Sequence, residues 1–157
     1  MQIDLADIYK APFGSEIETD IKIKPTELDQ EVELSAPLVG KVKIVRLEDG
    51  ILANFSINAF LKILCFRCAS DFIKKVKLEF NQKYIFTDTK EKAIIDKAPE
   101  EVSIGLTKKL DPWPVIRQEI LLFLPMKILC KKTCKGLCYD CGQNLNKRKC
   151  SDHRHKI

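Results

Sequence analysis

Apolar and polar residues alternate along the middle of the chain with a period of two, which is typical of β-strands. From Ile51 to Cys65 the odd positions are all apolar. The even positions include Asn54, Ser56, Asn58 and Lys62. This pattern predicts one long strand with a single buried face.

Two neighbouring segments alternate in the same way. Ahead of the long strand, Val42 and Ile44 alternate with Lys41 and Lys43. The Asp49-Gly50 step that follows them favours a tight hairpin turn. Behind the long strand, apolar residues at even positions continue as far as Phe86. We therefore expect an antiparallel meander whose second turn contains residues 65–68.

The segments outside this meander give weaker patterns. Isoleucine and threonine alternate with charged residues from Ile17 to Ile23, which predicts a short strand. The charged segment 87–101 has no usable period and contains Pro99, so it is expected to be a surface loop.

A helix is expected near residues 112–124. Asp111 can cap its free backbone N–H groups, and proline at position 112 is tolerated in a first turn. Pro125 should end it. The apolar face, which we expect to pack on the sheet, consists of Trp113, Ile116, Ile120 and Phe123.

Composition is that of an ordinary globular chain. Hydrophobic residues make up 45% and charged residues 31%, which excludes a disordered polyampholyte and a membrane protein. No apolar run is long enough to span a bilayer, and residues 1–10 lack the features of a secretion signal. A cytoplasmic location is expected.

Charge is unevenly distributed. Residues 1–36 contain three basic and nine acidic side chains, whereas residues 127–157 contain nine basic and two acidic ones. This asymmetry predicts a basic appendage that binds a polyanion, although thiolates bound to a metal would reduce its positive charge.

Seven cysteines in a chain without an export signal point to metal binding rather than to disulfides. Cys65 and Cys68 form a C-x2-C pair on the predicted turn. Gly142 follows a second C-x2-C pair and allows the tight turn of a zinc knuckle. The remaining candidate ligands are Cys130, Cys134, Cys138, Cys141, Cys150, His153 and His155.

These residues allow two arrangements of structural zinc, with two ions or one. In the favoured arrangement one site consists of Cys138, Cys141, Cys150 and His153, and the other consists of Cys65, Cys68, Cys130 and Cys134. The second of these sites would staple the tail to the turn of the meander. The alternative is a single site of Cys65, Cys68, Cys138 and Cys141, with Cys130, Cys134 and Cys150 left free.

The predicted fold class is α+β. It consists mainly of an antiparallel β meander or sheet, with one C-terminal helix packed on it and a small cysteine-rich zinc-binding tail. The β-rich body is expected to span residues 1–127, and the basic tail residues 128–157. The turn at 65–68 would tie the two together.

Catalytic patterns are absent from the sequence. It contains no H-E-x-x-H, no G-x-S-x-G, no phosphate-binding loop and no G-x-G-x-x-G. A thioredoxin-like redox role for Cys65 and Cys68 would require a parallel βαβ pattern that the surrounding sequence lacks. We expect a protein that is not an enzyme and has no small-molecule substrate.

Three segments resemble the YceD-like family, which is associated with accumulation of large-subunit ribosomal RNA. They are Cys65-x-Arg67-Cys68, residues 117–126 from Arg117-x-Glu119 into Leu124-Pro125-Met126, and residues 134–146 from Cys134-Lys135-Gly136 through Asn144-Leu145-Asn146. The family tail typically has a further cysteine just after the position of Cys150, where this chain has Asp152 and His153.

This resemblance implies a non-catalytic bacterial or organellar factor for processing or accumulation of large-subunit (23S) rRNA. Its partner would be that rRNA or an immature large-subunit particle, with no membrane involved. The alternative is an adaptor that holds a ribosomal protein or maturation factor without direct RNA contact. The candidate RNA-binding residues are Arg67, Lys131, Lys132, Lys135, Tyr139, Lys147, Arg148 and Lys149.

Overall fold

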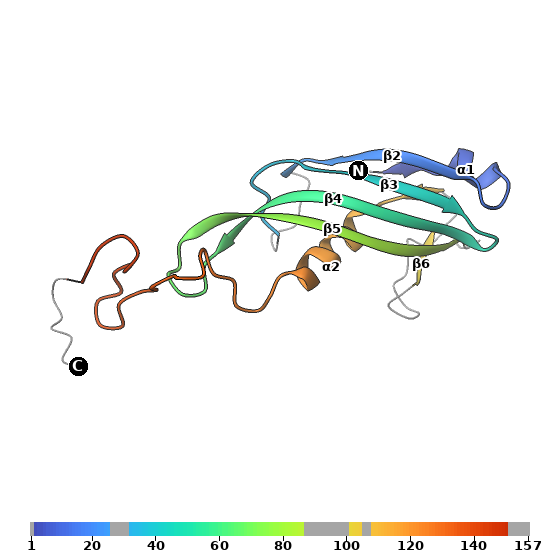
Figure 1. The fold of residues 1–157 in the computed structure, drawn as a ribbon. Helices are drawn as coiled ribbons and strands as arrows, with labels where there is room; N and C mark the ends of the chain where they lie inside the picture. The colour runs from blue at the N-terminus through green and yellow to red at the C-terminus, as the bar shows by residue number, and fades with distance from the viewer. Residues whose placement is uncertain (1, 26–31, 87–100, 105–107, 151–157) are drawn as a thin grey trace.

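A five-stranded sheet forms the body of the protein in the computed structural model, which describes residues 2–25, 32–86, 101–104 and 108–150 (Figure 1). Its strands follow the order β2-β3-β4-β5-β6. They are β2 (Glu16–Ile23), β3 (Leu38–Arg46), β4 (Gly50–Leu64), β5 (Asp71–Phe86) and β6 (Glu101–Ile104).

Strands β3 to β5 form the predicted antiparallel meander, and β2, the short strand expected from Ile17 to Ile23, pairs antiparallel with β3. At the turn between β3 and β4, the N–H of Leu47 donates to the carbonyl of Gly50 over 2.9 Å. Gly50 is required here because a Cβ at this position would collide with the backbone carbonyl of Tyr84. The predicted hairpin forms, but its central residues are Glu48 and Asp49, and Gly50 permits the close approach of β4 to β5 rather than a left-handed turn position.

Several short elements were not predicted. Strand β6 pairs parallel with β5 and begins at Glu101, the last residue of the expected loop, while residues 87–100 of that loop lie outside the described residues. Strand β1 (Ile3–Asp4) pairs antiparallel with β7 (Lys109–Leu110), and helix α1 (Ala6–Lys10) follows β1. Elements of two to five residues are too short to give a measurable hydrophobic period.

Helix α2 (Trp113–Phe123) confirms the predicted C-terminal helix. Asp111 accepts a hydrogen bond from the N–H of Trp113 at 3.1 Å, although Pro112 is the residue at the cap position. The prediction for Phe123 was wrong, because its side chain is 49% exposed. The helix ends there, and the extended Leu124 packs against the core in its place.

The hydrophobic core lies on one face of the sheet, where α2 packs beneath β5 (Figure 1). Phe55 of β4 is buried there and stacks on Phe80 with ring centroids 4.8 Å apart. The opposite face is polar, with exposed ion pairs such as Lys41 with Glu18. No helix among the described residues is long and apolar enough to cross a membrane.

The end of the sheet near α1 is closed by Arg46, whose side chain is only 9% exposed. Its guanidinium carbon lies 4.9 Å from the ring centroid of Phe86, 5.4 Å from that of Phe13 and 5.6 Å from that of Tyr9. It also donates to the carbonyl of Gly50 at 2.8 Å. These contacts hold the N-terminal segment against the β3–β4 turn.

Replacing Arg46→Met should lower the free energy of unfolding by about 2–3 kcal/mol, because the cation–π contacts are lost and backbone carbonyls lose their donor. Urea denaturation followed by circular dichroism measures this change. Lys22→Met, at an exposed position of β2, is the matched control and should stay within about 0.5 kcal/mol of the parent. Equal losses in the two variants would contradict a role for Arg46 in closing the sheet.

Candidate metal centre

Residues 127–150, here called the cysteine-rich tail, leave α2, pass the tip of the β4–β5 hairpin and extend beyond it (Figure 1). The N–H of Phe66 donates to the carbonyl of Ile128 at 2.8 Å, and the N–H of Leu137 donates to that of Arg67 at 3.2 Å. The tail is thus bonded to the hairpin tip along much of its length.

Four thiols meet where the tail joins the hairpin, and we call Cys65, Cys68, Cys130 and Cys134 the tip cluster. Their sulfur atoms all lie within 4.8 Å of one another, with Cys65 3.8 Å from Cys134 and Cys68 3.7 Å from Cys130. A disulfide would require about 2.05 Å. Four thiolates at about 2.3 Å around a tetrahedral zinc lie about 3.8 Å apart. The tip cluster therefore has the dimensions of a four-thiolate zinc site.

The surroundings of the tip cluster stabilise the thiolate of Cys65 and disfavour that of Cys130. Sγ of Cys65 accepts a hydrogen bond from the backbone N–H of Cys130 at 3.3 Å. Sγ of Cys134 accepts one from Nδ2 of Asn146, also at 3.3 Å. Burial would raise the pKa of Cys65, but backbone N–H groups, first that of Cys130, outweigh it and lower this pKa to about 6. Burial and the neighbouring thiols raise the pKa of Cys130 to about 12. A metal cation would supply the charge needed to deprotonate all four thiols.

The three sulfur atoms of the tail cluster, Cys138, Cys141 and Cys150, also lie within 4.8 Å of one another. Cys150 is 3.7 Å from Cys138 and 3.5 Å from Cys141. Backbone N–H groups of Cys141 and Asp140 lower the pKa of Cys138. The cluster could hold a metal ion with one further ligand, and His153, the residue predicted for that place, lies outside the described residues, as does His155.

This grouping follows the two-site arrangement, in which Cys130 and Cys134 join Cys65 and Cys68. The alternative single site of Cys65, Cys68, Cys138 and Cys141 is not formed, because the two pairs belong to separate clusters. The identity of the metal stays a prediction.

The two C-x2-C pairs adopt the same turn. In each, the residue after the second cysteine has a left-handed φ, 49° at Ala69 and 71° at Gly142. In each, this residue donates its N–H to the carbonyl of the first cysteine. The N–H of the first cysteine in turn donates to the carbonyl of the residue that follows the left-handed one. The bonds are Ala69 to Cys65 at 2.9 Å, Cys65 to Ser70 at 3.0 Å, Gly142 to Cys138 at 2.9 Å and Cys138 to Gln143 at 2.8 Å. The knuckle predicted at Gly142 thus has a counterpart at Ala69.

Two asparagines that had no assigned role tie residues 144–146 to the tip cluster and its turn. Asn146 bonds Sγ of Cys134 and accepts the N–H of Lys135 at 3.0 Å through Oδ1. Asn144 donates from Nδ2 to Oγ of Ser70 at 2.9 Å and accepts the N–H of Asn146 at 2.9 Å. The Asn-Leu-Asn segment was part of the family resemblance, which was the only sequence signal for these residues.

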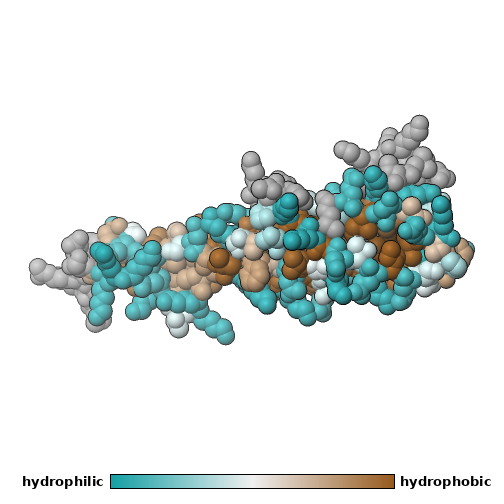
Figure 2. All heavy atoms as spheres, turned by 90° about the horizontal axis from the view of Figure 1, so that it is seen from above, coloured by the Kyte–Doolittle hydropathy of each residue, from teal (hydrophilic) through white to brown (hydrophobic). Residues whose placement is uncertain are grey.

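All eight predicted RNA-binding residues are exposed and lie in the tail or at the hairpin tip. Hydrophilic residues accordingly dominate this end of the molecule, whereas hydrophobic ones gather over the sheet (Figure 2). Arg67 donates from Nη1 to the carbonyl of Cys134 at 3.3 Å, so part of its role is to hold the tail. Within residues 127–150, no lysine or arginine forms an ion pair with another described residue.

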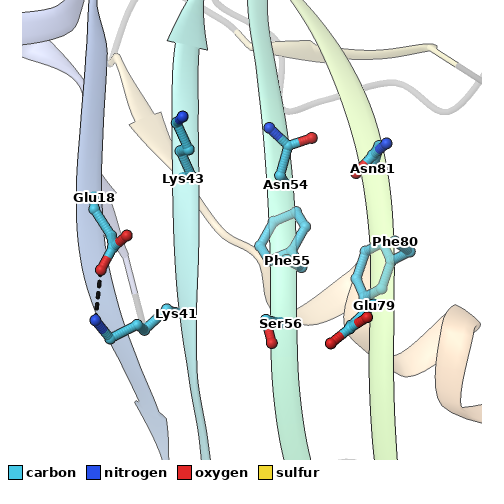
Figure 3. A pocket seen from close by; sticks show the side chains of 9 residues that line it. All are labelled: Glu18, Lys41, Lys43, Asn54, Phe55, Ser56, Glu79, Phe80 and Asn81. Carbon is cyan, nitrogen blue, oxygen red and sulfur yellow. Dashed lines mark hydrogen bonds and ion pairs between the residues drawn. The ribbon is translucent and has the colours of Figure 1, made fainter.

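A separate depression of about 420 Å³ lies over β2 to β5 (Figure 3). It is lined by charges of both signs, since Glu18 and Glu79 accompany Lys41 and Lys43. Lys41 is already paired with Glu18 there. Nothing in this depression favours an anionic or cationic ligand.

A family model described as "Large ribosomal RNA subunit accumulation protein YceD" matches residues 53–157, a segment that includes both cysteine clusters. The chain belongs to the YceD family. This membership supports a ribosome-related role.

Individual relatives have low sequence identity to this chain. Uncharacterised proteins of Mycobacterium bovis and Mycobacterium tuberculosis are each 25% identical over 161 residues, covering 99% of this chain and 75% of theirs. The chloroplastic YCED homolog 1 of Arabidopsis thaliana, named a large ribosomal RNA subunit accumulation protein, is 24% identical over 185 residues, covering 99% of this chain and 54% of its own. No solved structure matches the chain.

The full-length protein purified under reducing conditions should contain zinc, and Cys134→Ala should lower the content by about one ion per chain. Metal analysis by inductively coupled plasma mass spectrometry measures this. Thr133→Ala, an exposed neighbour, is the control and should keep the parental content. Parent protein without any metal would refute the proposed zinc sites.

Ala69→Gly should raise the free energy of unfolding of the metal-loaded protein by about 0.5–1 kcal/mol, because glycine adopts a left-handed φ without strain. Gly142→Ala should lower it by about 1 kcal/mol from backbone strain alone, since nothing lies within 4 Å of the added Cβ. Ala11→Gly is the control at an ordinary φ of −71° and should lower stability. Thermal unfolding measures all three, and a loss of stability in Ala69→Gly would contradict the equivalence of the two turns.

Proposed function

We propose that the protein is a non-catalytic factor that promotes processing or accumulation of large-subunit rRNA. It does so by binding rRNA or immature large-subunit particles through its basic, zinc-stabilised tail. The observation that carries this proposal is the group of exposed cations around two thiol clusters, which form no ion pair with another described residue.

Electrostatics favour a polyanion at this end of the chain. Residues 127–150 contain seven lysines and arginines against one acid, Asp140. Two zinc ions bound by seven thiolates would cancel part of this excess and still leave a net positive charge. Cations that have no acidic partner in the described tail are free to neutralise phosphates and to release their counterions.

The tail needs the metal for its shape. It contains no helix or strand, and apart from cysteines few of its side chains are buried. The apolar contacts of such a segment are too few to offset the conformational entropy that it loses on ordering. Zinc in the tip cluster would supply that free energy and fix the direction in which the cations point.

A specific observation also favours the adaptor function. Leu122 and Phe123 at the end of α2 are exposed, and Met126 after the helix is 98% exposed. An apolar patch of this kind fits a ribosomal protein or maturation factor better than it fits RNA. In that case RNA would contribute little to capture of the particle.

One comparison separates the two functions. Lys147, Arg148 and Lys149 replaced together by alanine should weaken RNA binding and reduce the slope of log K against log salt by about 2. The control replaces three exposed lysines of the body, Lys10, Lys22 and Lys24, and should leave the slope unchanged. Fluorescence anisotropy of a labelled large-subunit rRNA fragment measures both. Unchanged RNA binding in the tail variant would contradict the RNA function, and unchanged sedimentation with large-subunit particles would favour the adaptor.

A further inference from the structure

We propose that Phe66 and Tyr139 form a pair of stacking platforms for unpaired bases, so that the ligand of the tail is single-stranded rather than duplex RNA. This inference rests on the proposed RNA function and narrows its substrate class. It concerns two rings from segments far apart in the sequence.

The two rings occupy equivalent places. Each aromatic residue directly follows the first cysteine of a C-x2-C turn, and the two turns share their hydrogen bonds and their left-handed φ. Phe66 is 66% exposed and Tyr139 is 88% exposed, so neither ring serves a core. The same turn thus presents an aromatic ring to solvent twice, once from the hairpin tip and once from the tail.

Both rings are attached to fixed backbone. Phe66 is anchored by its own N–H, which bonds the carbonyl of Ile128, and each ring lies next to a cysteine of a cluster. A ring on fixed backbone loses little conformational entropy when a base stacks on it, in contrast to a ring on a flexible loop.

One short RNA strand can contact both rings. The carbonyl of Arg67 accepts the N–H of Leu137, which places this contact one residue from Phe66 and two residues from Tyr139. At 3.8 Å between successive Cα atoms, the Cα atoms of the two aromatic residues are no more than about 20 Å apart. A strand of several nucleotides can span such a distance.

The ligand class follows from ring chemistry combined with charge. Stacking on a side chain needs a free base face, and in a duplex these faces are covered by neighbouring base pairs. Exposed cations near the rings in sequence, Arg67 directly after Phe66 and Lys135 four residues before Tyr139, can bind the phosphates that connect two stacked bases. Aromatic rings together with cations suit single-stranded RNA. A purely apolar protein partner would offer no anionic groups to pair with these cations.

The test uses the full-length, zinc-loaded protein with two labelled RNAs of equal length, an unstructured single strand and a blunt duplex. Phe66→Leu and Tyr139→Leu keep apolar side chains but remove the rings, and each should weaken single-strand binding about tenfold. Duplex binding and the salt slope should stay unchanged, because no cation is lost. Tyr139→Trp should retain binding, and Phe123→Leu, at an exposed ring on α2, is the matched control.

Zinc content verifies that each variant keeps its metal-stabilised turn. Leucine variants that bind the single strand like the parent, while the tail lysine and arginine variant binds weakly, would overturn the platforms and leave the RNA function intact. A parent that binds neither RNA would overturn both proposals. Loss of co-sedimentation with large-subunit particles without loss of RNA affinity would assign the rings to a protein partner and overturn the inference.

Discussion

The contact between the β4–β5 hairpin tip and the cysteine-rich tail is the constraint on which the position of the tail depends. The tail has no core of its own, so its position is set by backbone bonds to Phe66 and Arg67 and by the four thiols of the tip cluster. Asn144 and Asn146 add side-chain bonds from the tail to Ser70 and to Cys134. Without this contact the basic residues would share a sequence segment but no common surface.

The length of the hairpin determines where this surface is placed. Strand β4 has 15 residues and β5 has 16, which at about 3.3 Å per residue corresponds to roughly 50 Å. One end of the sheet is closed by Arg46 among three aromatic rings, and the other end carries the thiols. The body therefore separates a packed, apolar end from an end where thiols and exposed cations gather.

Local patterns predicted much of this architecture, because alternation and turn residues act between neighbours in sequence. The meander, helix α2 and the knuckle at Gly142 belong to this class. The sequence left the partners of Cys65 and Cys68 open, since spacing gives no information on contacts across more than sixty residues. The turn at Ala69 was not predicted because alanine, unlike glycine, does not signal a left-handed φ. Phe123 was misplaced because it is the last residue of the helix, and the extended Leu124 packs against the core in its place.

The separation of the tip-cluster ligands along the chain also sets an order of assembly. Cys65 and Cys134 are 69 residues apart, and the strands of the meander lie ahead of Cys134 in the sequence. During synthesis from the N-terminus, the sheet can form while only half of the ligand set exists. The fourth thiol arrives after α2 has been made, so the site closes late. The sheet and α2 can therefore fold before the tip cluster closes, so the cysteine-rich tail is the last part of the described chain to be fixed in place.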